Sequence, residues 1–88
     1  MATESDIVKV YNELAGRNIK VLPREKRVKE ALEAFDVEDF RNTFLWAQND
    51  EWCKSADILK TRIGWICSYD VVAQHSDFQP PEEEAPWQ

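Results

Sequence analysis

The chain has 88 residues, of which ten are aromatic and two are cysteines, and its formal net charge is −6. At this length we expect one small domain with a modest core, since only about 60–65 % of the unfolded surface becomes buried. No apolar run approaches the roughly 20 residues that cross a bilayer, and no apolar stretch at the start is typical of a signal peptide. We therefore predict a cytoplasmic protein that makes no membrane contact.

The two cysteines do not form a recognisable metal motif. Cys53 and Cys67 lie fourteen positions apart, which is not the spacing of a CxxC pair, and His75 is the single histidine. In a cytosolic protein we expect both thiols to be reduced. The sequence therefore predicts no metal and no other cofactor.

Positive charge is concentrated in one stretch of the chain. Residues 1–16 carry −2, residues 17–29 carry +5, and residues 30–88 carry −9. An acidic chain is a weak candidate for nucleic-acid binding, but a local excess of cations can contact phosphates. We call residues 17–29 the basic stretch, and its cations are Arg17, Lys20, Arg24, Lys26, Arg27 and Lys29.

The first predicted helix covers residues 5–15. Thr3 or Ser5 is a suitable N-cap, and Gly16 is suited to a left-handed stop. Apolar residues recur at helical spacing and form one stripe. They are Ile7, Val8, Tyr11, Leu14 and Ala15.

A second helix is predicted from Pro23 to about Phe35. Pro23 fits the first turn, where its missing N–H leaves no hydrogen bond unmade. The early turns are basic and the later turns acidic, opposite to the preference that the helix dipole sets. This violated preference indicates that the cations serve another purpose.

The third predicted helix begins at Asp36, whose spacing to Asp39 resembles a capping box, and the pattern breaks at residues 49–50. Trp52 is then expected in a loop. A fourth helix is predicted from a cap at Ser55 through Cys67, although Gly64 interrupts its apolar stripe and favours a close backbone approach. A short turn or helical piece should follow at residues 69–78.

Residues 79–88, QPPEEEAPWQ, hold three prolines and three glutamates. This composition predicts disorder. Glu82, Glu83 and Glu84 followed by Trp87 are also typical of a short protein-binding motif, with a merely solubilising tail as the alternative. We therefore predict an all-α fold, a compact bundle of about four helices at residues 1–78 with a disordered acidic tail at 79–88.

The order of these segments resembles that of a known family, across roughly residues 6–79. The segments are IVKVYNEL, VLPREKRVKEAL, DVEDFRNTFLWAQ, DEWCKS and IGWICSYDVVAQHSDF. Together they resemble the C-terminal helical domain of phage replication-initiation proteins, the replisome organisers, with a looser likeness to DnaD-type primosome components. The resemblance implies contact with DNA and with the replicative helicase or its loader. The winged-helix domain that usually precedes this domain is not seen ahead of residue 6.

Each candidate site has an alternative explanation. The basic stretch is either a solvated helix face or a surface that contacts phosphates or an acidic protein. Contact with phosphates would require Lys20, Arg24 and Arg27 to converge on one face. Tryptophans most often pack in a core, but so small a domain cannot bury all of them. We expect Trp52 to be exposed as a protein-interface anchor.

No nucleophile motif or phosphate-binding glycine loop is found in the sequence, so we predict that the protein is not an enzyme. The favoured hypothesis is a phage replication accessory that binds the helicase or its loader, with weak DNA contact through the basic helix. The alternative is a small acidic phage protein that inhibits a host protein, such as a defence nuclease like a CRISPR effector or a replication enzyme. It would do so by surface occlusion or nucleic-acid mimicry.

Overall fold

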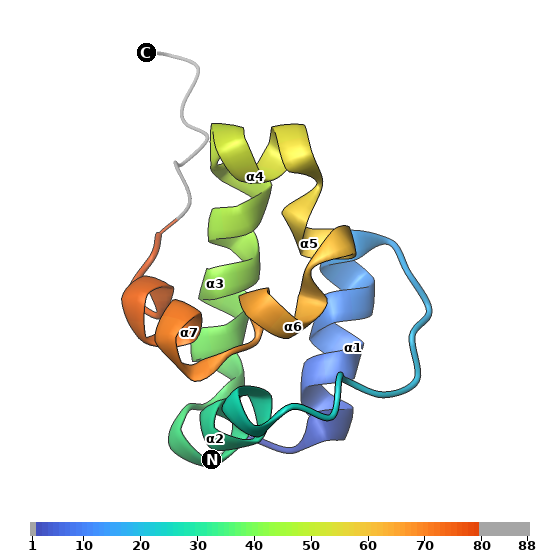
Figure 1. Ribbon diagram of the computed structural model, residues 1–88, viewed down its shortest axis with the longest axis vertical. Coiled ribbons are helices and arrows are strands. Elements are labelled where there is room, and N and C mark those ends of the chain that lie inside the picture. The colour runs from blue at the N-terminus through green and yellow to red at the C-terminus, as the bar shows by residue number, and fades with distance from the viewer. Residues whose placement is uncertain (1, 80–88) are drawn as a thin grey trace, which may run out of the picture.

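The computed structural model describes residues 2–79, and every element of regular structure in that range is a helix (Figure 1). The all-α prediction is therefore confirmed. Residues 80–88, which contain most of the predicted tail, lie outside the described residues. The helices are α1 (Glu4–Ala15), α2 (Lys26–Ala34), α3 (Val37–Asn49), α4 (Glu51–Ala56), α5 (Ile58–Thr61), α6 (Ile63–Ile66) and α7 (Tyr69–His75).

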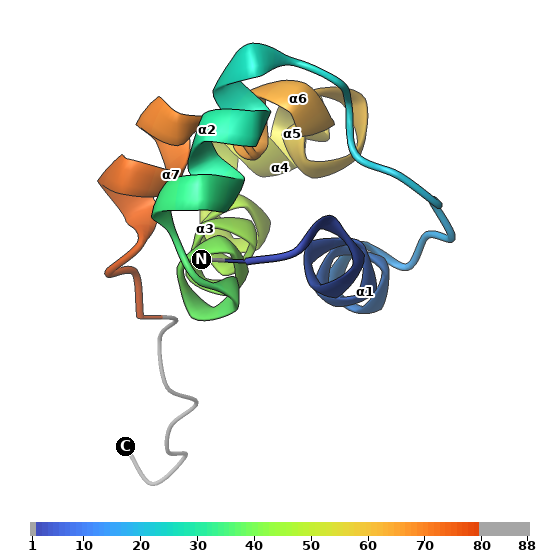
Figure 2. The same cartoon turned by 90° about the horizontal axis from the view of Figure 1, so that it is seen from below.

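Helix α3 is the centre of the fold, since it packs against α1, α4, α5, α6 and α7. Figure 2 shows α1 and α3 side by side. In this view α2, α5 and α6 lie above them, and α7 lies beside α2. The core lies between these layers. Its largest side chains are Tyr11, Phe40 and Phe44, which are fully buried, and the rings of Tyr11 and Phe44 meet edge to face at 5.6 Å.

The predicted ends of α1 are confirmed. The Thr3 hydroxyl accepts a hydrogen bond from the backbone N–H of Asp6 at 3.3 Å, and Gly16 is left-handed with φ of 69°. The chain then runs back along α1, where the Asn12 side chain bonds both the N–H and the carbonyl of Ile19 at 3.0 and 3.1 Å. These contacts hold the connector against α1 without regular structure of its own.

The prediction that Pro23 lies in the first turn of a helix is wrong. Helix α2 begins at Lys26 with Glu25 as its N-cap residue, so Pro23 belongs to the connector. The reason is tertiary, because the N–H of Leu22 donates to the Glu4 carboxylate on α1 at 2.7 Å and its side chain is buried. That attachment places Leu22 outside the helix, and Glu25 still has an extended backbone.

The predicted capping box of α3 is confirmed, because the backbone N–H of Asp36 donates to the Asp39 carboxylate at 3.1 Å. The expected loop around Trp52 is wrong. Asp50 ends α3 and also caps α4, where its carboxylate accepts from the N–H of Cys53 at 3.1 Å. Trp52 therefore lies on a helix.

The predicted fourth helix from Ser55 to Cys67 is divided among three short ones, and Ser55 lies inside α4 rather than at a cap. The chain turns at Asp57, which is left-handed with φ of 56°, and again at Arg62, with φ of −129° and ψ of 54°. These turns let α5 and α6 bury their apolar residues against the core. The buried residues are Ile58, Leu59, Ile66 and Cys67.

The predicted close approach at Gly64 is made by a side chain and not, as expected, by another stretch of backbone. A Cβ atom at this position would overlap the carboxylate of Glu25, so the missing side chain leaves room for that carboxylate on α6. Glu25 consequently makes no side-chain hydrogen bond that caps its own helix, α2.

Candidate protein-interaction surface

Three tryptophans and a histidine from four helices form a continuous aromatic row. Trp52 on α4 meets Trp65 on α6 edge to face at 6.0 Å, and Trp65 lies 6.3 Å from Trp46 on α3, both measured between ring centroids. Trp46 in turn stacks on His75 of α7 at 3.6 Å, with 17° between the ring planes. We call these four residues the tryptophan surface.

The outer end of this row faces solvent. Trp52 is 57 % exposed and Trp65 is 40 % exposed, whereas Trp46 and His75 are half-buried. The exposure of Trp52 confirms the prediction that it lies at the surface. The exposure of Trp65 was not predicted. Trp65 follows Gly64, which interrupts the apolar stripe of the predicted fourth helix, and this position could have indicated that its side chain lies outside the core.

Local structure explains why these large side chains point outward. Cys53, next to Trp52, is 1 % exposed. Adjacent residues lie about 100° apart around a helix, so burial of Cys53 directs the neighbouring indole away from the core. Ile66 and Cys67 are both fully buried at the end of α6, which leaves Trp65 to cover the outside of that turn. The ring nitrogen Nδ1 of His75 lies 2.9 Å from the carbonyl oxygen of Val71, which fixes the imidazole under Trp46.

The row has the chemistry of a protein-binding site. Exposed tryptophans retain large apolar areas in water, and burying them against a partner is favourable. Tryptophan is also among the residues most enriched where binding energy concentrates in protein interfaces. The half-buried Trp46–His75 pair packs against Trp65, one of the two exposed tryptophans.

Two cations of the basic stretch, Arg17 and Arg27, bond to other residues of the same molecule. Arg17 donates to the Tyr11 hydroxyl at 3.2 Å and to the carbonyl of Lys60 at 3.0 Å, and so links α1 to α5. Arg27 pairs with Asp70 on α7 at 2.5 Å and with Glu30 at 2.8 Å. Its hydrogen bond with Asp70 raises the pKa of the Arg27 guanidinium.

The other four cations, Lys20, Arg24, Lys26 and Lys29, are exposed and make no ion pair with any residue in the range 2–79. Lys20, Arg24 and Arg27, which were predicted to converge on phosphates, do not line one common pocket. Arg24 lines a pocket beside α1 and Arg27 lines two others near α7, while Lys20 lines none of these three.

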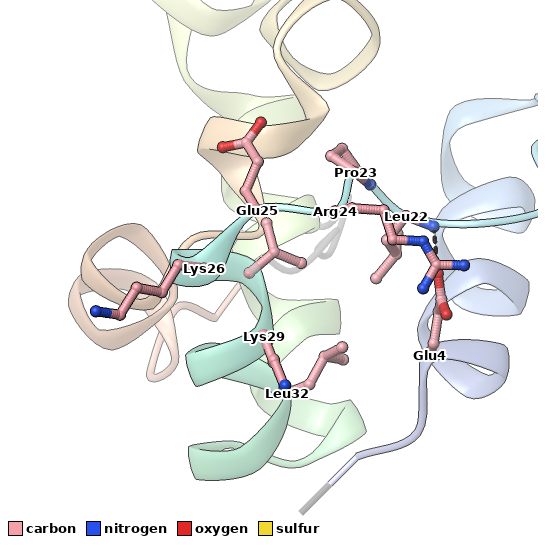
Figure 3. A pocket seen from close by; sticks show the side chains of 9 residues that line it. Glu4, Leu22, Pro23, Arg24, Glu25, Lys26, Lys29 and Leu32 are labelled. Carbon is pink, nitrogen blue, oxygen red and sulfur yellow. Dashed lines mark hydrogen bonds between the residues drawn. The ribbon is translucent and has the colours of Figure 1, made fainter.

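The pocket beside Arg24 has a volume of about 370 Å³ and lies between the start of α1 and α2 (Figure 3). Lys26 and Lys29 also line it, but Figure 3 shows Lys26 directed away from the other two cations. The remaining predicted binding residues, Glu82, Glu83, Glu84 and Trp87, lie outside the described residues.

Both thiols are buried and free. Loss of hydration raises the pKa of Cys67 to about 12, and the same effect, with a smaller contribution from the Asp50 carboxylate, raises that of Cys53 to about 11. Among residues 2–79, no three His, Cys, Asp or Glu side chains are grouped so as to hold a metal ion. In the same range no helix combines the length and apolar character that crossing a membrane requires.

No protein-family model, curated protein or solved structure matches this chain. The likeness to phage replication-initiation domains stays a prediction from the motifs of residues 6–79.

Proposed function

We propose that this chain is a non-catalytic binding module that contacts another protein through the tryptophan surface. The observation that carries the proposal is the pair Trp52 and Trp65, which are 57 % and 40 % exposed and touch each other at the surface. Two adjacent exposed indoles on separate helices form an apolar anchor that a partner can bury.

The sequence resemblance suggests what the partner is. It implies the replicative helicase or its loader, in the cytoplasm of a bacterial host of a phage. Weak DNA contact would be an accessory property of the unpaired cations Lys20, Arg24 and Lys29, and it would fall steeply with salt.

Inhibition of a host protein is the second candidate. The charge of −9 over residues 30–88 favours it, because an acidic surface can occupy a site built for nucleic acid. Exposed carboxylates on α2 and α3, such as Glu33 and Glu38, would then be needed for binding. The tryptophan surface would anchor the complex in either case.

A tagged pull-down from a bacterial lysate, with and without nuclease treatment, tests the proposal. We expect the wild type to capture a helicase or its loader under both conditions, and Trp52→Ala with Trp65→Ala to lose that capture. Val21→Ala is the matched control, because Val21 is 52 % exposed but lies in the connector between α1 and α2.

The other outcomes are equally informative. Capture that survives removal of both indoles would exclude the tryptophan surface. Capture that disappears after nuclease treatment would show that nucleic acid, rather than protein contact, mediates the association. Recovery of a nuclease or a replication enzyme, lost on neutralising Glu33 and Glu38, would identify the protein as an inhibitor.

A further inference from the structure

The pocket between α1 and α2 combines an apolar floor with a cationic rim. Leu22 and Val28 are each only 2 % exposed, and Leu32 is half-buried beside them. Arg24 and Lys29 line the same pocket (Figure 3). We call this site the cationic pocket. It is separate from the tryptophan surface, since none of its lining residues belongs to that row.

Neither of the two carboxylates that line the cationic pocket forms an ion pair with its cations. Glu4 accepts the hydrogen bond from the backbone N–H of Leu22 at 2.7 Å. The side chain of Glu25 turns the other way, toward Gly64 on α6, as Figure 3 also shows. Arg24 and Lys29 consequently have no ion-pair partner among residues 2–79.

This arrangement defines the chemistry of a ligand. Carboxylates would pair with Arg24 and Lys29, and a large apolar side chain beside them would cover the floor formed by Leu22, Val28 and Leu32. A peptide that places several acidic residues next to an aromatic one meets both requirements. A phosphate or a nucleic-acid backbone would meet only the first.

We propose that the cationic pocket binds an acidic, tryptophan-containing peptide, and that its occupant is segment 82–87 of the same chain, EEEAPW. Charge complementarity supports this occupant, because the segment carries three glutamates and the pocket carries Arg24 and Lys29, which form no ion pair with any of residues 2–79. Trp87 supplies the aromatic side chain three positions after the last of them.

The segment follows closely after the end of the described chain. The described chain ends at Gln79, just after α7, and α7 packs against α2, which carries Lys29 and Leu32. The following nine residues, 80–88, extend up to about 30 Å. Glu82, Glu83 and Glu84 lie three to five residues after Gln79, within about 18 Å of it, and Trp87 lies eight residues after it, within about 28 Å.

Fluorine NMR of the full chain labelled with 5-fluorotryptophan tests the proposal. The resonance of Trp87 is identified by its loss in Trp87→Phe. We expect it to differ from that of the labelled free peptide PPEEEAPWQ, and to move to the peptide position in Arg24→Glu with Lys29→Glu and in 1 M salt. Lys9→Glu with Arg41→Glu is the matched control, since it makes the same charge change on exposed residues outside the pocket.

The other three tryptophan resonances report whether each variant keeps its fold. A Trp87 resonance that already matches the free peptide in the wild type would overturn the proposal. A displaced resonance that persists in Arg24→Glu with Lys29→Glu would exclude this pocket. A shift that changes on tenfold dilution of the protein would assign the segment to a second copy and overturn the intramolecular contact. None of these outcomes depends on the partner bound at the tryptophan surface.

Discussion

The hydroxyl of Tyr11 on α1 donates a 2.7 Å hydrogen bond to the carbonyl oxygen of Leu59 on α5, 48 positions further along the chain. The ring of Tyr11 is fully buried against Phe44 of α3, and Arg17 donates to its hydroxyl oxygen at 3.2 Å. One side chain thus connects three helices through both its ring and its hydroxyl group.

Tyr11→Phe should lower the free energy of unfolding by about 1–3 kcal/mol, because the buried carbonyl of Leu59 loses its donor. Urea denaturation followed by circular dichroism measures this change. Tyr69→Phe is the matched control and should have no measurable effect, since its hydroxyl makes no hydrogen bond within residues 2–79. Equal losses in the two variants would contradict the importance of the Tyr11–Leu59 bond.

The two glycines should respond differently to alanine. Gly16→Ala should cost about 1 kcal/mol of unfolding free energy, because Gly16 has φ of 69°. Gly64→Ala should cost clearly less, since the added Cβ meets only the flexible end of Glu25, which can rotate away. Thermal unfolding of both variants provides the comparison, and a larger loss for Gly64→Ala would show that Glu25 is held rigidly in place.

Alkaline pH should destabilise the fold through the buried thiols. In the unfolded chain these thiols ionise near pH 9.0, whereas burial raises the pKa to about 11 for Cys53 and about 12 for Cys67. Above pH 9 the unfolded state therefore binds fewer protons, so stability is fully present below pH 9 and falls as the pH rises. The slope is about 1.4 kcal/mol per pH unit for each thiol.

Urea denaturation between pH 8 and pH 10.5 under reducing conditions measures this loss. Cys67→Ala should flatten the dependence by about half, since one of the two thiols is removed. An unchanged slope in Cys67→Ala would mean that other groups cause the alkaline loss.

Trp52→Ala should leave the free energy of unfolding within about 0.5 kcal/mol of the wild type, because Trp52 is 57 % exposed. Phe44→Ala, in the core, should cost about 3–5 kcal/mol, since Phe44 is fully buried. Urea denaturation of both variants separates the two roles. A loss of several kcal/mol in Trp52→Ala would make this indole a structural residue rather than an interface anchor.

Short-range patterns in the sequence correctly predicted both ends of α1 and the start of α3. Thr3 and Gly16 delimit α1 through contacts within a few residues, and the Asp36–Asp39 box starts α3 in the same way. The predictions failed where distant contacts decide the backbone. Pro23 lies outside α2 because Glu4 holds Leu22, and no local pattern encodes that bond.

The sequence by itself determined the helical class, the burial of the apolar stripes, the concentration of cations in residues 17–29 and the exposure of Trp52. Only the tertiary structure decided how residues 50–67 divide into three helices, because turns at Asp57 and Arg62 bring four apolar residues to one core. It also decided that Arg17 and Arg27 bond within the molecule while Arg24 and Lys29 line a pocket. Periodicity fixes which face of a helix is apolar, but only packing brings the aromatic rings of four separate helices into one row.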